Sequence, residues 1–261
     1  MTQFKPLSSI VTPRFSEVAT FFRLPIEKDL SKLDYCICGV PWDGGTTNRP
    51  GARHGPREIR NASSLVRSYH PVSLKSPYDI CNIADIGDCN VNPANLNDSL
   101  SKIEQFYKKI FESNTIPISI GGDHLISLPI LRGLKNKQPV GLFQFDSHSD
   151  TWDAYFGDFK YTHGTPFRRA IEENLIDPKR YVMLGIRGSL YDPDDLTWAR
   201  QQGVTIITID EYYEMGFKKC VEKIYDILDG IPVYFTFDID GIDPTFAPGT
   251  GTPEVGGFNV R

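Results

Sequence analysis

Hydrophobic residues gather in short runs along this chain, and longer segments of helical character separate the runs. The runs predict strands at Tyr35–Val40, Ile80–Ala84, Ile116–Ile120, Val140–Phe145, Tyr181–Gly185, Val204–Ile209 and Val233–Phe237. The segments between them predict helices at Pro56–Ser68, Asn97–Ser113, Leu125–Lys135, Pro166–Asn174, Pro193–Gln202 and Glu211–Asp229. Strands that alternate with helices are typical of an α/β protein with a mostly parallel sheet.

Acidic and histidine side chains follow three of the predicted strands. The three clusters are Gly121-Gly122-Asp123-His124, Asp146-Ser147-His148-Ser149-Asp150 and Asp238-Ile239-Asp240. Ligands of parallel sheets bind beyond the carboxyl ends of the strands, so we expect these side chains to meet there. Crowded carboxylates repel one another unless a cation lies between them. The candidate metal ligands are His124, Asp146, His148, Asp150, Asp238 and Asp240.

The spacing within the clusters indicates which metal they hold. In Asp146-x-His148-x-Asp150 and in Asp238-x-Asp240, alternate residues of extended backbone point to the same side. Four aspartates and two histidines suit a pair of borderline-hard ions such as Mn²⁺ better than zinc or copper, since no thiolate is near. Taken singly, the Gly-Asp-His segment is more often only a turn and Asp-x-Asp only a helix cap. Together, the clusters favour two Mn²⁺ ions about 3.5–4 Å apart.

A histidine outside the clusters is the best candidate for moving protons. His163 lies between the second cluster and the helix predicted at Pro166–Asn174. Histidine is the side chain whose unperturbed pKa lies near neutral pH, so we predict a catalytic role for it. The alternative is a surface-loop histidine that caps the next helix. His54 and His70 lie outside the clusters and are interpreted as structural.

Composition narrows the class of protein. A chain of 261 residues that is 40% hydrophobic can form one large domain, and its net charge of −5 disfavours nucleic acid or an anionic membrane as partner. No apolar stretch approaches the ~20 residues that a membrane span needs, and the first residues lack the apolar core of a secretory signal. Five cysteines without zinc-site spacing, of which Cys36 and Cys38 share one side of a strand, fit a reducing cytoplasmic setting.

The clusters also resemble a known family. Together with the stretch from Asp238 to Glu254, which reads DIDGIDPTFAPGTGTPE, they closely resemble the three signature motifs of the ureohydrolases, the arginase and agmatinase family. The resemblance extends from about Pro13 to Arg261, and the third motif is very specific. It implies an arginase-like three-layer sandwich around a mostly parallel, doubly wound sheet. It also implies homo-oligomers, either trimers or hexamers.

Carried over by motif, the resemblance divides the ligands between two Mn²⁺ ions. His124, Asp146, Asp150 and Asp238 would hold one ion, and Asp146, His148, Asp238 and Asp240 would hold the other. Members of the family hydrolyse guanidino compounds to urea and an amine by attack of a metal-bridging hydroxide on the guanidinium carbon. The histidine that matches His163 helps to protonate the departing amine.

Residues near the second motif narrow the substrate. Arginases usually carry asparagine where this chain has Trp152, and the segments Gly39–Arg57 and His163–Arg169 resemble the agmatinase and guanidinobutyrase branch. We therefore expect agmatine, cleaved to putrescine and urea, with 4-guanidinobutanoate as the alternative. Asp153 is the candidate substrate-binding residue, and its alternative is a solvated loop acid. Among other side chains near the site, Asp158 or Tyr155 could favour an ammonium tail, whereas Arg49 or Lys160 could favour a carboxylate tail.

One departure from the family concerns the end of the sequence. Family members normally continue for roughly 40–60 residues past the third motif, through a strand, a helix and a glutamate that holds the guanidinium. We therefore expect a single domain over residues 1–261 that lacks its C-terminal strand and helix. Two other classes remain as alternatives. One is a single-zinc deacetylase on the related fold, and the other is a truncated family member that binds metal without catalysis.

Overall fold

The computed structural model describes residues 4–134 and 138–261, which divide into two compact units. The N-terminal unit comprises the described residues of Met1–Asp43 together with Gly51–Asp123. The C-terminal unit comprises the described residues of Gly44–Pro50 and His124–Arg261. The short segment Gly44–Pro50 thus belongs by its contacts to the second unit, although the first unit flanks it in sequence. The expectation of a single domain stays a prediction.

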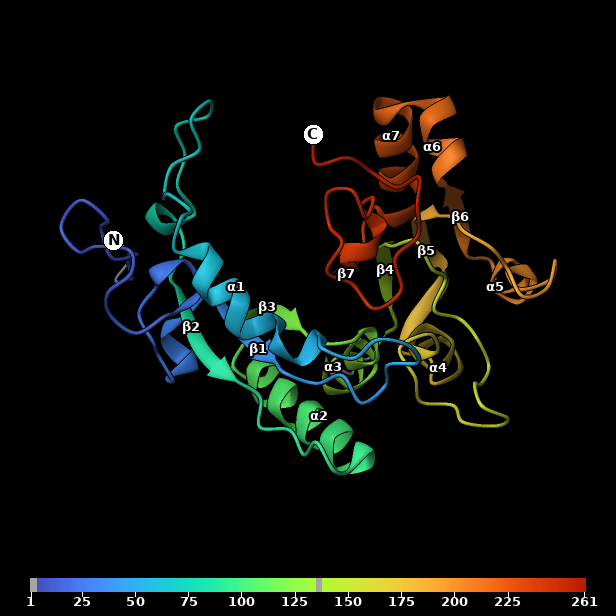
Figure 1. The fold of residues 1–261 in the computed structure, drawn as a ribbon, viewed down its shortest axis with the longest axis horizontal. Coiled ribbons are helices and arrows are strands. Elements are labelled where there is room, and N and C mark those ends of the chain that lie inside the picture. Colours follow the sequence, from blue (N-terminus) through green and yellow to red (C-terminus); the bar gives the residue numbers. More distant parts are fainter. Residues whose placement is uncertain (1–3, 135–137) are drawn as a thin grey trace. The chain divides into compact units, whose positions relative to one another are not determined.

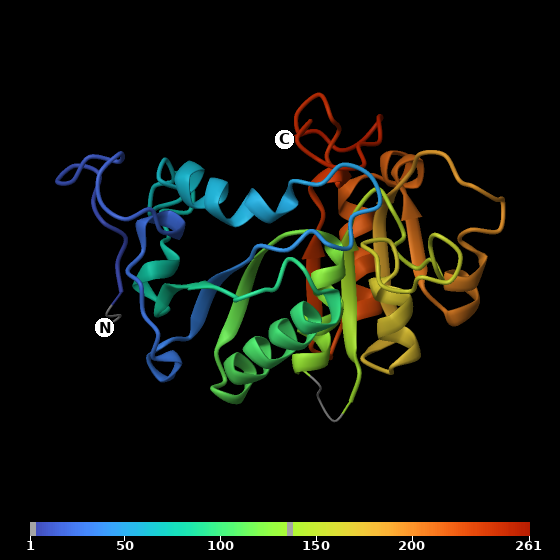
Figure 2. The same ribbon diagram turned by 60° about the horizontal axis from the view of Figure 1, so that its bottom comes forward.

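The N-terminal unit is built on a parallel sheet of three strands in the order β2-β1-β3 (Figure 1). These strands are β1 (Tyr35–Val40), β2 (Ile83–Asp88) and β3 (Ile116–Gly121), with helices α1 (Gly55–Ser63) and α2 (Leu96–Glu112). The helices lie on opposite sides of the sheet (Figure 2). On the α2 side, Cys38 of β1 approaches Tyr107, with 3.4 Å between Sγ and the hydroxyl oxygen. Cys36 and Cys38 are both fully buried free thiols.

The C-terminal unit contains a parallel sheet of four strands in the order β6-β5-β4-β7. The strands are β4 (Val140–Phe145), β5 (Ile176–Ile186), β6 (Thr205–Thr208) and β7 (Val233–Phe237). The helices are α3 (Ser127–Leu134), α4 (Pro166–Glu172), α5 (Thr197–Gln202), α6 (Ile209–Met215) and α7 (Phe217–Leu228). Short 3₁₀ turns complete the described chain at Phe21–Arg23, Leu30–Lys32, Ala52–His54, Pro77–Asp79, His124–Ile126 and Ile239–Gly241.

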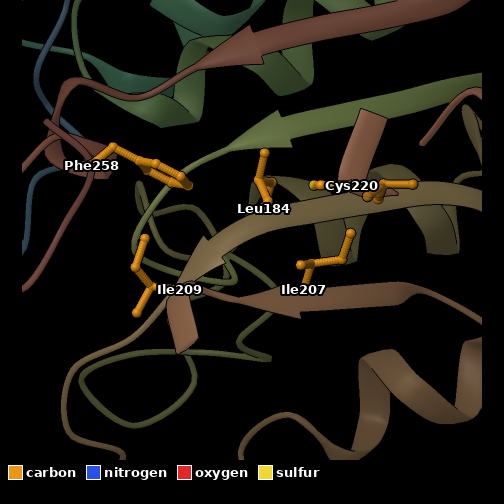
Figure 3. Close-up of a cluster of buried hydrophobic side chains, with 6 residues drawn as sticks. Leu184, Ile207, Ile209, Cys220 and Phe258 are labelled. Carbon is orange, nitrogen blue, oxygen red and sulfur yellow. The ribbon is translucent and has the colours of Figure 1, made fainter. Parts of the chain in front are cut away.

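An apolar cluster of the C-terminal unit lies between β5, β6 and the helices α6 and α7, which lie beside these strands in Figure 1. Figure 3 shows Leu184, Ile207, Ile209, Cys220 and Phe258 converging in this cluster, in which each is at least nine-tenths buried. Helix α6 begins at a capping box, because the Thr208 side chain accepts from the backbone N–H of Glu211 while the Glu211 carboxylate accepts in return. Phe143 and Phe145 of β4, the strand that precedes the second ligand cluster, pack against the same apolar cluster.

The predicted α/β class and the parallel pairing are confirmed, because every strand pair within the described residues is parallel. The described strands form two sheets, however, in which β3 and β7 are each the last strand. No helix in residues 4–134 or 138–261 is both long and apolar enough to cross a membrane.

Several predicted bounds were wrong for local reasons. The strand predicted at Ile80–Ala84 lies later, at β2, because a 3₁₀ turn at Pro77–Asp79 leaves Ile80 exposed. The helix predicted at Glu211–Asp229 is broken in two at Gly216, whose φ of 78° is left-handed. The last residue of the helix predicted at Leu125–Lys135 lies outside the described residues.

Turns shorten two other predicted helices. The helix predicted at Pro193–Gln202 starts only at Thr197, because the carboxylate of Asp195 accepts from two preceding backbone N–H groups and holds a turn there. The helix predicted at Pro56–Ser68 ends at Ser63. Each of these errors concerns where an element begins or ends, and none changes the order of elements that leads to the site.

Candidate metal centre

The candidate ligands of the C-terminal unit follow two neighbouring strands. Strands β4 and β7 pair in parallel, with Phe145 opposite Phe237, so both strands end at the same edge of the sheet. The backbone N–H of Asp238 donates to the carbonyl of Phe145 at 2.8 Å, which joins the two segments just beyond the strands. Asp146, His148 and Asp150 follow β4, and Asp238 and Asp240 follow β7. His124 opens the 3₁₀ turn before α3.

The first group of candidate ligands surrounds one nitrogen of His124. Its Nδ1 atom lies 3.1 Å from Oδ2 of Asp146, 2.8 Å from Oδ2 of Asp150 and 3.2 Å from Oδ2 of Asp238. His124, Asp146 and Asp150 are all buried, and each offers a ligand atom within 4.8 Å of the others. On the far side of the ring, Nε2 lies 2.8 Å from Oγ1 of Thr236.

The second group shares Asp146 with the first and adds His148 and Asp240. The Nδ1 atom of His148 lies 3.1 Å from Oδ2 of Asp240 and 3.8 Å from Oδ1 of Asp146. Asp240 is itself held by Ser147, whose hydroxyl donates to Oδ1 at 2.6 Å. The carboxylate of Asp146 therefore belongs to both groups of candidate ligands.

The chain reaches this arrangement by a turn rather than by the extended backbone that the spacing predicted. Strand β4 ends at Phe145, and Asp150 has a φ of 51°, in the left-handed region. The backbone N–H of His148 donates to Oδ1 of Asp146 at 2.8 Å, a local bond typical of aspartate in turns. The predicted ligands meet, but the local conformation that the alternate spacing predicted was wrong.

Burial and crowding both raise the pKa of Asp146, whereas they oppose each other at the two histidines, whose pKa values are raised as well. Burial, followed by the charges of Asp240, Asp150 and Asp238, raises the pKa of Asp146 well above its usual value. Burial alone would lower the pKa of His124, but the nearby carboxylates of Asp146, Asp150 and Asp238 raise it well above the ordinary value. Burial also lowers the pKa of His148, but Asp240 and the nearby aspartates outweigh it and raise this pKa to about 10. The cluster therefore attracts positive charge.

The donor set fits divalent metal ions. The Nδ1 atom of His124 is buried without a hydrogen-bond partner, although three carboxylate oxygens lie around it. A cation at this point would satisfy both the nitrogen and the carboxylates. Oxygen and imidazole ligands without a thiolate suit Mn²⁺ and similar borderline ions.

A cavity of about 330 Å³ opens beside the second group, and His163 lies in its wall. The backbone N–H of His163 donates to the carbonyl of Gly45 at 2.8 Å, and its Nε2 atom lies 2.7 Å from Oγ1 of Thr47. Burial lowers the pKa of His163 and so favours the neutral imidazole. The residues that line the cavity are Thr47, Asn48, Ser147, His148, Ser149, Asp150, Trp152, Tyr155, His163, Gly164, Ile186, Arg187, Ser189, Leu190, Tyr191, Leu196, Thr252, Pro253 and Glu254.

The structure places Asp153 differently from the other predicted site residues. Its carboxylate accepts from the buried guanidinium of Arg169 at 2.8 Å and lies 3.5 Å from Arg168. Among the described residues, Asp153 is absent from the cavity wall, and so are Arg49, Asp158 and Lys160. Of the side chains proposed for the substrate tail, Tyr155 alone is among the lining residues.

Sequence reasoning missed several residues of the cavity wall. Thr47 and Asn48 lie in the glycine-rich loop after β1, within the segment Gly39–Arg57 that resembles the agmatinase and guanidinobutyrase branch. Arg187 follows the carboxyl end of β5, at the same kind of position as the ligand clusters. Its guanidinium donates to the carbonyls of Asp240 and Glu254, at 2.6 Å and 2.8 Å, and so holds two segments of the site together. Its position directly after a strand is the signal in the sequence that could have identified it.

Comparison with known proteins agrees with this geometry. A sequence model of the arginase family matches residues 33–261. The chain belongs to the arginase family. The predicted resemblance to ureohydrolases of the agmatinase and guanidinobutyrase branch is thereby confirmed, together with the class of hydrolase that it implies.

Two curated relatives and one solved structure illustrate the likeness within the arginase family. The chain is 53% identical to a guanidinopropionase of Pseudomonas aeruginosa, over 97% of this chain and 80% of the relative. It is 44% identical to a guanidinobutyrase of the same organism, over 98% of this chain and 81% of that relative. The structure of proclavaminate amidinohydrolase from Streptomyces clavuligerus superposes with a TM-score of 0.90 at 39% identity, covering 95% of this chain and 82% of that one.

Proposed function

We propose that this chain hydrolyses a guanidino compound to urea and an amine at a centre of two Mn²⁺ ions. The observation that carries the proposal is the position of Asp146. Its carboxylate belongs to both groups of candidate ligands, and the cavity opens beside the second group. Two adjacent groups that share a carboxylate are the arrangement that a pair of ions requires.

The ligand assignment follows the family motifs and the measured contacts. His124, Asp146, Asp150 and Asp238 would hold one ion, and the three contacts of His124 Nδ1 support this set. Asp146, His148, Asp238 and Asp240 would hold the other, which the contact between His148 and Asp240 supports. When bound, two divalent ions lower the pKa of water and polarise the guanidinium.

His163 is the proposed proton carrier of the reaction. In the overall reaction, a guanidinium and one water give urea and an alkylammonium, so protons of the water must reach the departing nitrogen. A neutral imidazole in the cavity wall can accept a proton and pass it to that nitrogen. Thr47 and the carbonyl of Gly45 fix the ring for this task through the contacts at Nε2 and the backbone N–H.

The cavity lining favours a substrate with a carboxylate tail. Its carboxylates, among the described residues, are Asp150 and Glu254. Asp150 is a proposed metal ligand, and Oε1 of Glu254 lies 3.8 Å from Nε2 of His148, so both lie near the guanidinium end. Apart from the two histidines, the other polar side chains of the wall are neutral or, as in Arg187, positive. An ammonium tail finds no separate anion there.

We therefore propose a guanidino acid, such as 3-guanidinopropanoate or 4-guanidinobutanoate, as the substrate. The names of the two relatives, guanidinopropionase and guanidinobutyrase, point the same way. Agmatine, the substrate that the sequence favoured, is the second candidate. A cytoplasmic setting and assembly into trimers or hexamers stay predictions.

The test is urea release by Mn²⁺-loaded protein from 3-guanidinopropanoate, 4-guanidinobutanoate, agmatine and arginine in parallel, with the bound metal counted in the same preparation. We expect two Mn²⁺ per chain and urea from one of the guanidino acids. Urea from agmatine alone would reverse the tail assignment. Two bound ions without urea from any compound would indicate a metal-binding family member without catalysis, and a single bound Zn²⁺ would favour the deacetylase-like alternative.

A further inference from the structure

A buried carboxamide lies beneath the shared carboxylate of the metal centre. Gln144 belongs to β4, two residues before Asp146, and its side chain is fully buried. Its Nε2 atom donates to Oδ2 of Asp146 at 2.8 Å and to the carbonyl of His148 at 3.0 Å. Both amide protons of Gln144 are therefore used within the turn that carries the candidate ligands.

A second buried side chain determines which way this carboxamide faces. Tyr181 of β5 is also fully buried, and its hydroxyl donates to Oε1 of Gln144. That hydroxyl satisfies the carboxamide oxygen while the amino group faces Asp146 and the carbonyl of His148. With the amide reversed, Oε1 would lie against a carboxylate and a carbonyl, three acceptors without a proton among them.

Asp146 needs a fixed orientation because its two oxygens face different groups of ligands. Oδ2 lies 3.1 Å from Nδ1 of His124, and Oδ1 lies 3.8 Å from Nδ1 of His148. The backbone N–H of His148 holds Oδ1, and Gln144 holds Oδ2. A rotation of this carboxylate would move both sites at once.

We propose that Gln144 and Tyr181 are a pair of positioning residues that fix the carboxylate of Asp146 and thereby set the affinity of both ion sites. The described hydrogen bonds of the pair reach Asp146 and the backbone of His148, and neither side chain is among the residues that line the cavity. Residues that orient metal ligands in this way typically change metal affinity by about 10- to 100-fold when they are lost. This inference rests on the proposed metal centre.

Two variants test the pair, and a third is their control. Tyr181→Phe removes the hydroxyl and keeps the ring, which packs against Phe167 with 5.9 Å between ring centroids. Gln144→Met keeps the length of the side chain and removes all three hydrogen bonds. Tyr107→Phe is the matched control, because Tyr107 is also fully buried and donates its hydroxyl to Ser119 at 2.6 Å, in the N-terminal unit.

The measurement is a titration of metal-free protein with Mn²⁺, in which electron paramagnetic resonance follows the signal of free aqueous Mn²⁺. Thermal unfolding of the same metal-free proteins measures the purely structural cost. We expect Tyr181→Phe and Gln144→Met to weaken Mn²⁺ binding by about 10- to 100-fold. Tyr107→Phe should leave binding unchanged, even where its metal-free unfolding midpoint falls by as much as that of Tyr181→Phe.

Wild-type affinity in Tyr181→Phe would overturn the inference, as would an equal loss of affinity in Tyr107→Phe. Should Gln144→Met fail to fold, the milder Tyr181→Phe decides alone. The readout does not depend on catalysis. A wild type that binds two ions but releases no urea would overturn the proposed activity and leave the titration as a full test of the pair, whereas a wild type that binds no Mn²⁺ would overturn both.

Discussion

Thr236 contacts His124 on the ring nitrogen that faces away from the carboxylates, with 2.8 Å between Oγ1 and Nε2. If Nε2 carries the proton and donates it to Thr236, then Nδ1 is left with its lone pair directed at Asp146, Asp150 and Asp238. This is the tautomer that a metal ligand requires, and the threonine hydroxyl can accept its proton without touching the metal.

Replacing that threonine should weaken the first ion site. We expect Thr236→Val, which preserves shape, to lower Mn²⁺ affinity by about 10- to 100-fold because Nε2 of His124 loses the hydrogen-bond partner that orients the ring. Calorimetric titration of metal-free protein measures this. Thr115→Val is the control, since the Thr115 hydroxyl donates to the carbonyl of Leu30 in the N-terminal unit. Equal Mn²⁺ affinities in Thr236→Val and Thr115→Val would show that Thr236 does not support the ion site.

His163→Asn should separate catalysis from metal binding. The side chain of His163 lines the cavity, and the described contacts of its ring include Thr47 but no proposed ligand. We expect kcat for urea release to fall by about 100- to 10,000-fold while two Mn²⁺ remain bound, as general acid–base residues typically behave. His70→Asn, on an exposed histidine of the N-terminal unit, should retain full activity. Lost metal in His163→Asn would instead make this residue part of the ion site.

Asp153→Asn decides between two interpretations of the same carboxylate. Its partners in the structure are Arg169 and Arg168, so we expect the KM for every active substrate to be unchanged. Because the Asp153 side chain is half exposed, the free energy of unfolding should fall by no more than about 1 kcal/mol. Steady-state kinetics and denaturant unfolding measure the two effects. A rise of tenfold or more in the KM for agmatine would support the substrate contact that the sequence predicted.

Asp243→Asn should remove a pH dependence from the stability of the third motif. Oδ1 of Asp243 accepts from the Thr245 backbone N–H and hydroxyl, and Oδ2 accepts from the N–H groups of Gly256 and Gly257. The hydroxyl and the backbone N–H of Thr245 lower the pKa of Asp243 to about 2, and the backbone N–H groups of Gly257 and Gly256 act in the same direction. Asparagine keeps one acceptor oxygen and turns its amino group toward the remaining donors, so the variant should be less stable at pH 6.

The sign of this effect follows from the lowered pKa. Because the native state binds the proton less readily than the unfolded state, the stabilisation is complete above the ordinary pKa near 3.8. It is lost as the pH falls from about 4 toward 2. The difference in unfolding midpoint between wild type and Asp243→Asn should therefore shrink over that range. A difference that stays constant with pH would mean that the carboxylate charge contributes nothing there.

Removing metal should destabilise the C-terminal unit, since crowded carboxylates then lack a counter-charge. Each bound ion should add about 2.7 kcal/mol to the free energy of unfolding at a free concentration 100 times its Kd. Thermal unfolding with a chelator and then with excess Mn²⁺ measures this. An unfolding midpoint that chelation leaves unchanged would contradict a centre of two ions.

Much of the candidate site could be predicted because it depends on the order of strands and clusters along the chain. Asp146 and Asp238 each follow an apolar run directly, and a parallel sheet brings such positions to one edge. The backbone turn that carries Asp150 could not be predicted in the same way, since a left-handed φ in a residue other than glycine is a local exception. The start of β2 was missed because a proline turn at Pro77–Asp79 interrupted the apolar run.

Contacts between distant segments were beyond a sequence pattern. The pairing of Thr47 with His163 joins a loop after β1 to a loop before α4, and no periodicity encodes it. Gln144 looked like one more residue of an apolar run, and only its buried neighbours Tyr181 and Asp146 explain a carboxamide at that position. Such positions are fixed by packing in three dimensions.

The segment Gly44–Pro50 has a consequence for how the chain acquires its site during synthesis. The side chain of Asn48 donates to the carbonyl of Gly251 at 2.7 Å, so residues from opposite ends of the sequence close the same wall. A ribosome that has delivered the first ligand clusters still has the partner of Asn48 to translate. On a nascent chain the glycine-rich loop therefore cannot make this contact until Gly251 has been synthesised, and the cavity is among the last features to form.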